Sequence, residues 1–156
     1  MDEPKTSGVR FPPPLIVLGF LGAGYVVHRV LPKSIAGAHV TLLRAAGGIL
    51  VIAAVTLASS AIVAFRKFGT SPIPTRPTTA LVETGPYRFT RNPMYVSMVL
   101  LGLGVSLLTN SWWMVVSALG AALALNFLVI AKEERYLGAM FGDAYRNYTA
   151  RVRRWI

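Results

Sequence analysis

The sequence predicts an all-α integral membrane protein with about four transmembrane helices, built as a single domain over residues 1–156. Hydrophobic residues make up 54% of the chain and gather into four long blocks, as in membrane-spanning segments. The net charge is +10, and the cations lie between and after these blocks, as in the cytoplasmic flanks of membrane proteins. No nucleic-acid partner is expected, because a basic groove would need a soluble scaffold that this chain lacks.

The first two apolar blocks form the predicted anchoring half, residues 1–65. Residues 15–31 would span roughly 26 Å as a helix, just enough to cross a bilayer. Small residues in this block are expected to allow close helix packing, namely Gly19, Gly22 and Gly24. The N-terminal segment lacks the small-residue cleavage pattern of a signal peptide, so this first block is expected to be retained. Residues 42–65 are long enough to span with some tilt.

Residues 66–92 form the start of the predicted catalytic half, residues 66–156. Four prolines exclude a continuous helix here, and five Lys or Arg residues make the segment basic. Long loops without regular structure are usually functional or disordered. Two interpretations are open: a basic loop that lies on anionic lipid, or a loop whose last third folds over a site.

The third and fourth blocks predict a helical hairpin. Residues 93–108 begin with a proline at a favourable first helical position, and Asn92 is a natural N-cap. A tight polar turn, residues 109–111, precedes the fourth block, residues 112–131, which starts with two tryptophans at the expected depth of a membrane interface.

The C-terminal tail predicts an amphipathic basic helix suited to the membrane surface. One face carries aromatic and apolar residues at helical spacing, namely Tyr145, Tyr148, Val152 and Trp155. With four crossings, the N-terminus, the long loop and the tail share one side, which holds thirteen Lys and Arg residues against three. That side is predicted to be the cytoplasm.

Two polar clusters at the edge of the predicted bilayer are the candidate site. Residues 85–95 hold two arginines, two prolines and two tyrosines, and Glu133 and Glu134 follow directly after the fourth block. Adjacent carboxylates in such a place need cations nearby, either an arginine or a cationic ligand. Gly102 and Gly104 either pack helices or let a ligand approach the backbone.

These motifs resemble the integral-membrane methyltransferases, a superfamily that includes isoprenylcysteine carboxyl methyltransferases and phospholipid N-methyltransferases. The resemblance covers about residues 81–156 and rests on Gly85-Pro86-Tyr87, Arg91-Asn92-Pro93-Met94-Tyr95, Glu133-Glu134, and Phe141-Gly142 with two later tyrosines. It implies a cytosol-facing pocket for S-adenosylmethionine, closed by the C-terminal amphipathic helix, and a lipophilic substrate that enters from the bilayer.

The resemblance also implies roles for particular residues. Arg91 and Glu134 would serve catalysis. The cofactor would contact Tyr87, Arg91, Asn92, Pro93, Tyr95, Gly102, Gly104, Glu133, Glu134, Tyr145 and Tyr148. The carboxylates suit its amino group and sulfonium, an arginine suits its carboxylate, and tyrosines suit its adenine. No metal is expected.

The acceptor stays open between a carboxyl oxygen, an amine nitrogen and a thiol sulfur. Asn92 stands where isoprenylcysteine enzymes commonly have histidine, and an asparagine cannot act as a base near neutral pH. An amine acceptor would then need Glu133 or Glu134 to remove its proton.

Two other classes of protein fit parts of the sequence. A non-catalytic membrane scaffold or transport-type protein would bind no cofactor and would tolerate substitution of Glu133, Glu134 and Arg91. A module that binds lipid surfaces through its basic loop and tail would show binding that salt screens. The brevity of the chain favours a prokaryotic inner or plasma membrane.

Overall fold

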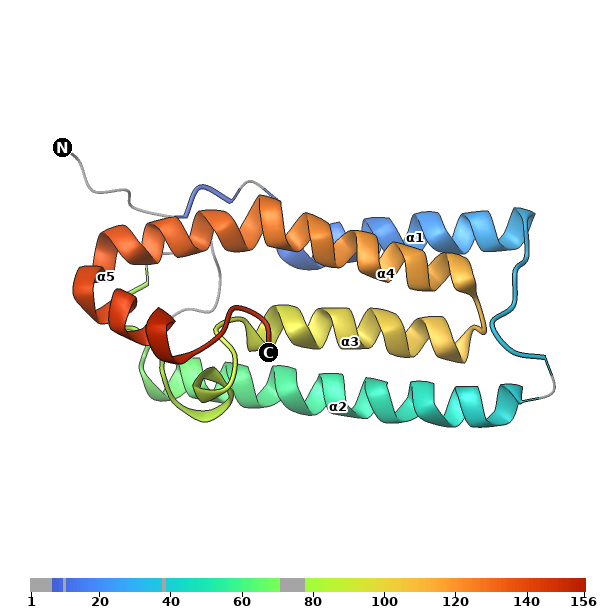
Figure 1. The fold of residues 1–156 in the computed structure, drawn as a ribbon, viewed down its shortest axis with the longest axis horizontal. Helices are drawn as coiled ribbons and strands as arrows, with labels where there is room; N and C mark the ends of the chain where they lie inside the picture. Colours follow the sequence, from blue (N-terminus) through green and yellow to red (C-terminus); the bar gives the residue numbers. More distant parts are fainter. Residues whose placement is uncertain (1–6, 10, 38, 71–77) are drawn as a thin grey trace.

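A computed structural model describes residues 7–9, 11–37, 39–70 and 78–156. Four long helices run antiparallel in sequence order: α1 (Pro13–Val30), α2 (Val40–Lys67), α3 (Pro93–Leu108) and α4 (Trp112–Leu125) (Figure 1). The described residues form no strand beyond one isolated bridge between Ser34 and Ser111. The predicted all-α class is therefore confirmed.

Three helices are long and apolar enough to cross a membrane: α1, α2 and the continuous helix that starts with α4. The apolar helix α3 is shorter, with 16 residues. The four apolar blocks predicted from the sequence therefore appear as four helices. The third has the predicted bounds, because a proline at its start and a polar turn at its end mark them clearly.

Close helix packing occurs at glycines, where backbones can approach. A Cβ atom at Gly104 would lie 2.9 Å from the carbonyl oxygen of Gly47 on α2. A Cβ atom at Gly24 of α1 would clash with the Ser117 hydroxyl of α4. Gly19 and Gly22 face open space instead, so only one of the three glycines predicted to pack in α1 does so.

The fourth block does not end where the sequence predicted. The chain continues from α4 through a π-helical turn, η2 (Asn126–Ile130), directly into α5 (Ala131–Arg151). Charged residues follow η2 without stopping the helix, because Lys, Glu and Arg are good helix formers. At Gly142 the backbone has a φ of 51° and a ψ of −120°, and the helix turns back toward α2 and α3 (Figure 1).

This reversal corrects the prediction for the tail. The aromatic face of the C-terminal helix packs against the protein, because Tyr145 and Tyr148 are buried with Val152. The same face cannot rest on a membrane surface. The helix also ends at Arg151, so Trp155 does not extend the face and packs into a different core cluster.

The predicted N-cap at Asn92 is also corrected. Asn92 occupies the cap position of α3, yet its side chain makes no capping hydrogen bond. Its Nδ2 atom instead donates to the carbonyl oxygen of Arg154, at 2.9 Å. The side chain therefore ties α3 to the C-terminal segment.

Candidate functional site

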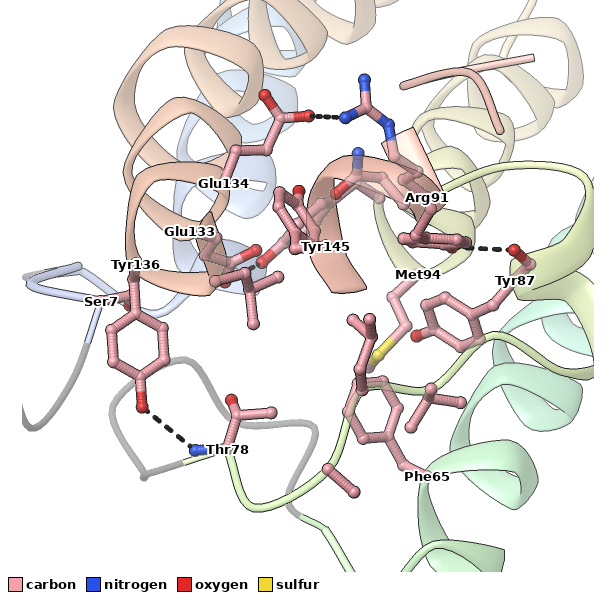
Figure 2. A pocket seen from close by; sticks show the side chains of 17 residues that line it. Ser7, Phe65, Thr78, Tyr87, Arg91, Met94, Glu133, Glu134, Tyr136 and Tyr145 are labelled. Carbon is pink, nitrogen blue, oxygen red and sulfur yellow. Dashed lines mark hydrogen bonds and ion pairs between the residues drawn. The ribbon is translucent and has the colours of Figure 1, made fainter. Parts of the chain in front are cut away.

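The candidate site is a cavity at the end of the bundle where α5 folds back over α2 and α3 (Figures 1 and 2). It contains about 810 Å³ of empty space, counting the part open to solvent. Ionic side chains and tyrosines line it together with apolar ones, which suits a ligand that carries both charge and a ring.

Residues 85–93 bring the sequence motif to the cavity. A 3-10 turn, η1 (Gly85–Arg88), places Tyr87 in a buried position, with its ring edge-on to Phe65 at a centroid distance of 5.3 Å. Gly85 has a φ of 60°, which glycine adopts without steric cost. Pro93 then starts α3 and is fully buried. Tyr95, in the first turn of α3, lines the cavity.

Glu133 is a half-buried carboxylate in the cavity wall. Its Oε1 atom accepts a hydrogen bond of 2.7 Å from the Tyr95 hydroxyl. Glu133 lies beyond the apolar part of its helix, which ends at Ile130. Burial raises the pKa of Glu133 to about 7; the Tyr95 hydrogen bond lowers the pKa and the charge of Glu134 raises it further. A positive ligand group beside Glu133 would favour the ionised form.

Glu134 is held by two arginines. Its Oε1 atom lies 3.2 Å from Arg91 Nη1 and accepts a 3.1 Å hydrogen bond from Arg154 Nε. Its Oε2 atom accepts from Arg154 Nη2. Arginine donors therefore occupy both carboxylate oxygens, which leaves Glu134 less available to a ligand than Glu133.

Arg91 reaches the cavity from the loop before α3 (Figure 2). Its Nη1 atom faces Glu134, whereas its buried Nε atom has no hydrogen-bond partner among the described residues. A buried donor without a partner is costly, and an anionic ligand group would satisfy it.

Tyrosines from α5 close the side of the cavity near η1. The Tyr148 hydroxyl donates a 2.8 Å hydrogen bond to the backbone carbonyl of Tyr87. Tyr145 lies beside Tyr148, with ring centroids 6.2 Å apart. Burial raises the pKa of both Tyr87 and Tyr148, so the phenols stay protonated and neutral.

The structure brings most of the sequence-predicted site residues to one cavity. The lining includes Tyr87, Arg91, Asn92, Tyr95, Glu133, Glu134, Tyr145 and Tyr148. Pro93 is buried at the start of α3 and does not line it. Gly102 and Gly104 do not line it either, because they contact Ala118 and Leu21, and Val51 and Gly47, respectively. These two glycines pack helices together.

Several lining residues were missed by the sequence reasoning. They are mostly apolar and come from distant segments: Ser7, Phe65, Thr78, Ala80, Leu81, Val82, Met94, Tyr136 and Leu137. Ser7 and Phe65 belong to the predicted anchoring half, so that half also contributes to the cavity. The sequence offered a signal for Tyr136 and Leu137, since both lie within three residues of the Glu-Glu pair on the same helix.

Comparison with known proteins gives two results. The family model for phospholipid methyltransferases matches residues 42–144, about two thirds of the chain. An uncharacterized protein from Haemophilus influenzae is 38% identical over 63 residues, which cover 40% of this chain and the whole of that protein. The region matched by the family model contains α3, α4, the Glu-Glu pair and Arg91. The chain therefore belongs to the phospholipid methyltransferase family.

Proposed function

We propose that this protein transfers a methyl group from S-adenosylmethionine to a lipophilic acceptor embedded in the membrane. The observation that carries this proposal is that one cavity holds Glu133, a half-buried carboxylate with a raised pKa, and Arg91, whose Nε donor has no partner among the described residues. The cofactor has an amino group and a sulfonium for a carboxylate, and a carboxylate for an arginine. The donor set of the cavity therefore fits it.

Within this proposal, each residue has a distinct task. Glu133 binds the positive part of the cofactor, and Arg91 binds its carboxylate. Tyr145 and Tyr148 offer aromatic surface for the adenine or the sulfonium. The C-terminal half of α5 closes the cavity and limits the entry of water, which strengthens these interactions.

Bound S-adenosylmethionine would supply an activated methyl group. The protein aligns the acceptor with that group, and alignment alone can provide about 7 kcal/mol or more. For an amine acceptor, Glu133 is better placed than Glu134 to receive a proton, because Glu134 is held by two arginines. A carboxylate acceptor would need no base.

The orientation of the protein is part of the proposal. The described N-terminal residues, the loop before α3 and α5 lie at the same end of the bundle as the cavity (Figure 1). In the sequence, residues 1–14, 66–92 and 132–156 together hold thirteen of the sixteen Lys and Arg residues. Cytoplasmic segments carry such an excess, so the cavity would open to the cytosol, where the cofactor is made.

The test is methyl transfer from labelled S-adenosylmethionine by the purified protein in detergent with native lipid extract. We expect label in a lipid fraction, and loss of that label in Glu133→Gln. Asp143→Asn is the matched control, since Asp143 is an exposed carboxylate on the same helix that does not line the cavity. Wild-type protein that binds no S-adenosylmethionine would overturn the proposal and leave a membrane scaffold as the better account.

A further inference from the structure

The C-terminal segment Arg153–Trp155 crosses the start of α3 after α5 has ended at Arg151. Its backbone is bonded to the motif loop at two consecutive positions. The carbonyl of Arg153 accepts from the Arg91 amide at 2.9 Å. The carbonyl of Arg154 accepts from Asn92 Nδ2 at 2.9 Å and from the Thr90 hydroxyl at 3.2 Å. We call this segment the C-terminal strap.

The side chains of the strap are bonded to α5 and to the π-helical turn before it. The guanidinium of Arg154 makes two hydrogen bonds to the carboxylate of Glu134. Its third nitrogen, Nη1, lies 3.4 Å from Asn126 Oδ1, which also accepts from Trp155 Nε1 at 3.2 Å. A π-helical turn is rare and often marks a functional position. Here the π-helical turn carries Asn126, whose side-chain oxygen accepts hydrogen bonds from Arg154 and Trp155.

These contacts join three parts of the cavity wall. Arg154 contacts Glu134 through its side chain and Asn92 through its carbonyl, and Arg91 is bonded to both the strap and Glu134. Two arginines on Glu134 balance its charge, and they leave Glu133 as the carboxylate of the pair that no cation contacts among the described residues.

We infer that Arg154 is a positioning residue, which fixes Glu134 and the Arg91–Asn92 loop so that Glu133 and Arg91 present their ligand-binding groups to the cavity. This inference rests on the proposed function. Arg154 does not line the cavity, so it acts through its partners. Residues that orient ligand-binding groups often matter about 10–100-fold for affinity, although they touch no ligand.

The first test measures binding of S-adenosylmethionine by the detergent-solubilised protein. We expect Arg154→Gln to raise the dissociation constant about tenfold or more, since it removes the charge and the fork of donors that hold Glu134. Arg154→Lys keeps the charge but has no planar fork, so it should recover part of the loss. Arg146→Gln is the control: Arg146 is an exposed arginine on α5 that pairs with Asp143 outside the cavity.

The second test needs no cofactor. Hydrogen exchange of the ligand-free protein should show faster exchange of the Arg91 amide in Arg154→Gln, because that amide donates to the strap. Amides in the distant turn at residues 109–111 should keep their wild-type rates. Asn126→Leu gives a second variant, because it removes the acceptor that anchors Arg154 and Trp155. We expect it to raise the dissociation constant for S-adenosylmethionine and the exchange rate of the Arg91 amide, each by less than Arg154→Gln does.

The outcomes separate the two proposals. If the wild-type protein binds no S-adenosylmethionine, the proposed function fails, and the exchange experiment still decides whether the strap holds the loop. If the wild type binds the cofactor and Arg154→Gln matches it in affinity and exchange, the positioning role is wrong. If Arg154→Gln fails to fold, Arg154→Lys and Asn126→Leu decide: wild-type affinity and exchange in both would overturn the inference.

Discussion

The two ends of the helix bundle use polar side chains in opposite ways. At the end away from the cavity, polar side chains complete backbone hydrogen bonds of the α1–α2 linker. Asn110 accepts from the amides of Ile35 and Ala36 and donates to the Ala36 carbonyl, and Trp113 donates to the Leu31 carbonyl at 2.7 Å. These bonds fix the described part of the linker to the start of α4 and the turn before it.

At the cavity end, ionic side chains line empty space instead. Glu133 has a raised pKa, and the Nε atom of Arg91 lacks a partner among the described residues. Stability alone would favour satisfying or removing such groups. The far end also holds one buried atom without a partner among the described residues, His28 Nδ1. The contrast is therefore one of charge: the far end joins neutral polar groups to the linker, whereas the cavity end gathers ionic groups that a ligand would satisfy. Four predictions test this contrast.

The largest effect is expected at Glu133. Glu133→Gln should lower methyl transfer about 100-fold or more, because glutamine cannot balance a cation in a buried site. Glutamine keeps an acceptor for the Tyr95 hydroxyl, so the thermal midpoint of the detergent-solubilised protein should not fall. The measurements are transfer of labelled methyl and thermal unfolding. A variant that loses stability together with activity would contradict the contrast.

The opposite pattern is expected at Asn110. Asn110→Ala should destabilise the protein by about 3 kcal/mol, because it removes three hydrogen bonds to the linker and places alanine at the φ of 52° that Asn110 adopts. Affinity for S-adenosylmethionine should stay at the wild-type value in the folded fraction. Asn110→Gly removes the same bonds without the backbone strain, so it separates the two causes. Weaker cofactor binding in Asn110→Gly would show that the two ends are coupled.

A third prediction concerns Gly104, which sequence reasoning had assigned to the cofactor. Gly104→Ala should cost about 2 kcal/mol of stability, because its Cβ atom would lie 2.9 Å from the Gly47 carbonyl oxygen of α2. Cofactor affinity should change less than about twofold, since Gly104 does not line the cavity. Thermal unfolding and binding measurements on the same preparation check both parts. A large loss of affinity with unchanged stability would restore the original assignment.

The fourth prediction concerns pH. Glu133 binds a cation only when it is ionised, and its pKa is raised to about 7. Affinity for S-adenosylmethionine should therefore fall as the pH drops below 7, by about tenfold per unit. The ligand-free protein should show the reverse trend: the folded state holds this proton more tightly than an unfolded carboxyl with a pKa of 4.5, so stability falls as the pH rises from 4.5 to 7.

Binding curves and thermal midpoints across this pH range measure both trends. Glu133→Gln should flatten the stability trend, and Asp143→Asn should leave both trends in place. An affinity that does not change between pH 5 and pH 8 would mean that Glu133 does not contact the positive part of the ligand.

The sequence predicts the helices well because their signals are local. Pro93 and the polar turn mark both ends of α3, and hydropathy marks the rest. Most of the ionic and tyrosine residues of the candidate site were also predicted, because they are polar residues at the edge of an apolar block. The roles of Gly102 and Gly104 were not, since a glycine in a helix gives no indication of whether a ligand or another helix lies against it.

The missing information is tertiary. The reversal at Gly142 depends on a single positive φ. The helical pattern of the surrounding residues does not predict a reversal at that position. The partners of Arg154 lie 20 residues away at Glu134 and 62 residues away at Asn92, so no spacing rule connects them. Apolar lining residues such as Leu81 and Val82 are chemically ordinary, and only the fold brings them to the cavity.

The reversal at Gly142 makes chain length matter more than residue identity in the segment that follows. Between this glycine and Arg154, the helix must place the Tyr148 hydroxyl against the Tyr87 carbonyl. It must then end at the residue that lets the C-terminal strap reach the loop before α3. One inserted residue would rotate everything after it by about 100° and shift it by about 1.5 Å along the axis. Homologous chains should therefore vary in their exposed side chains over this stretch and keep the number of residues constant.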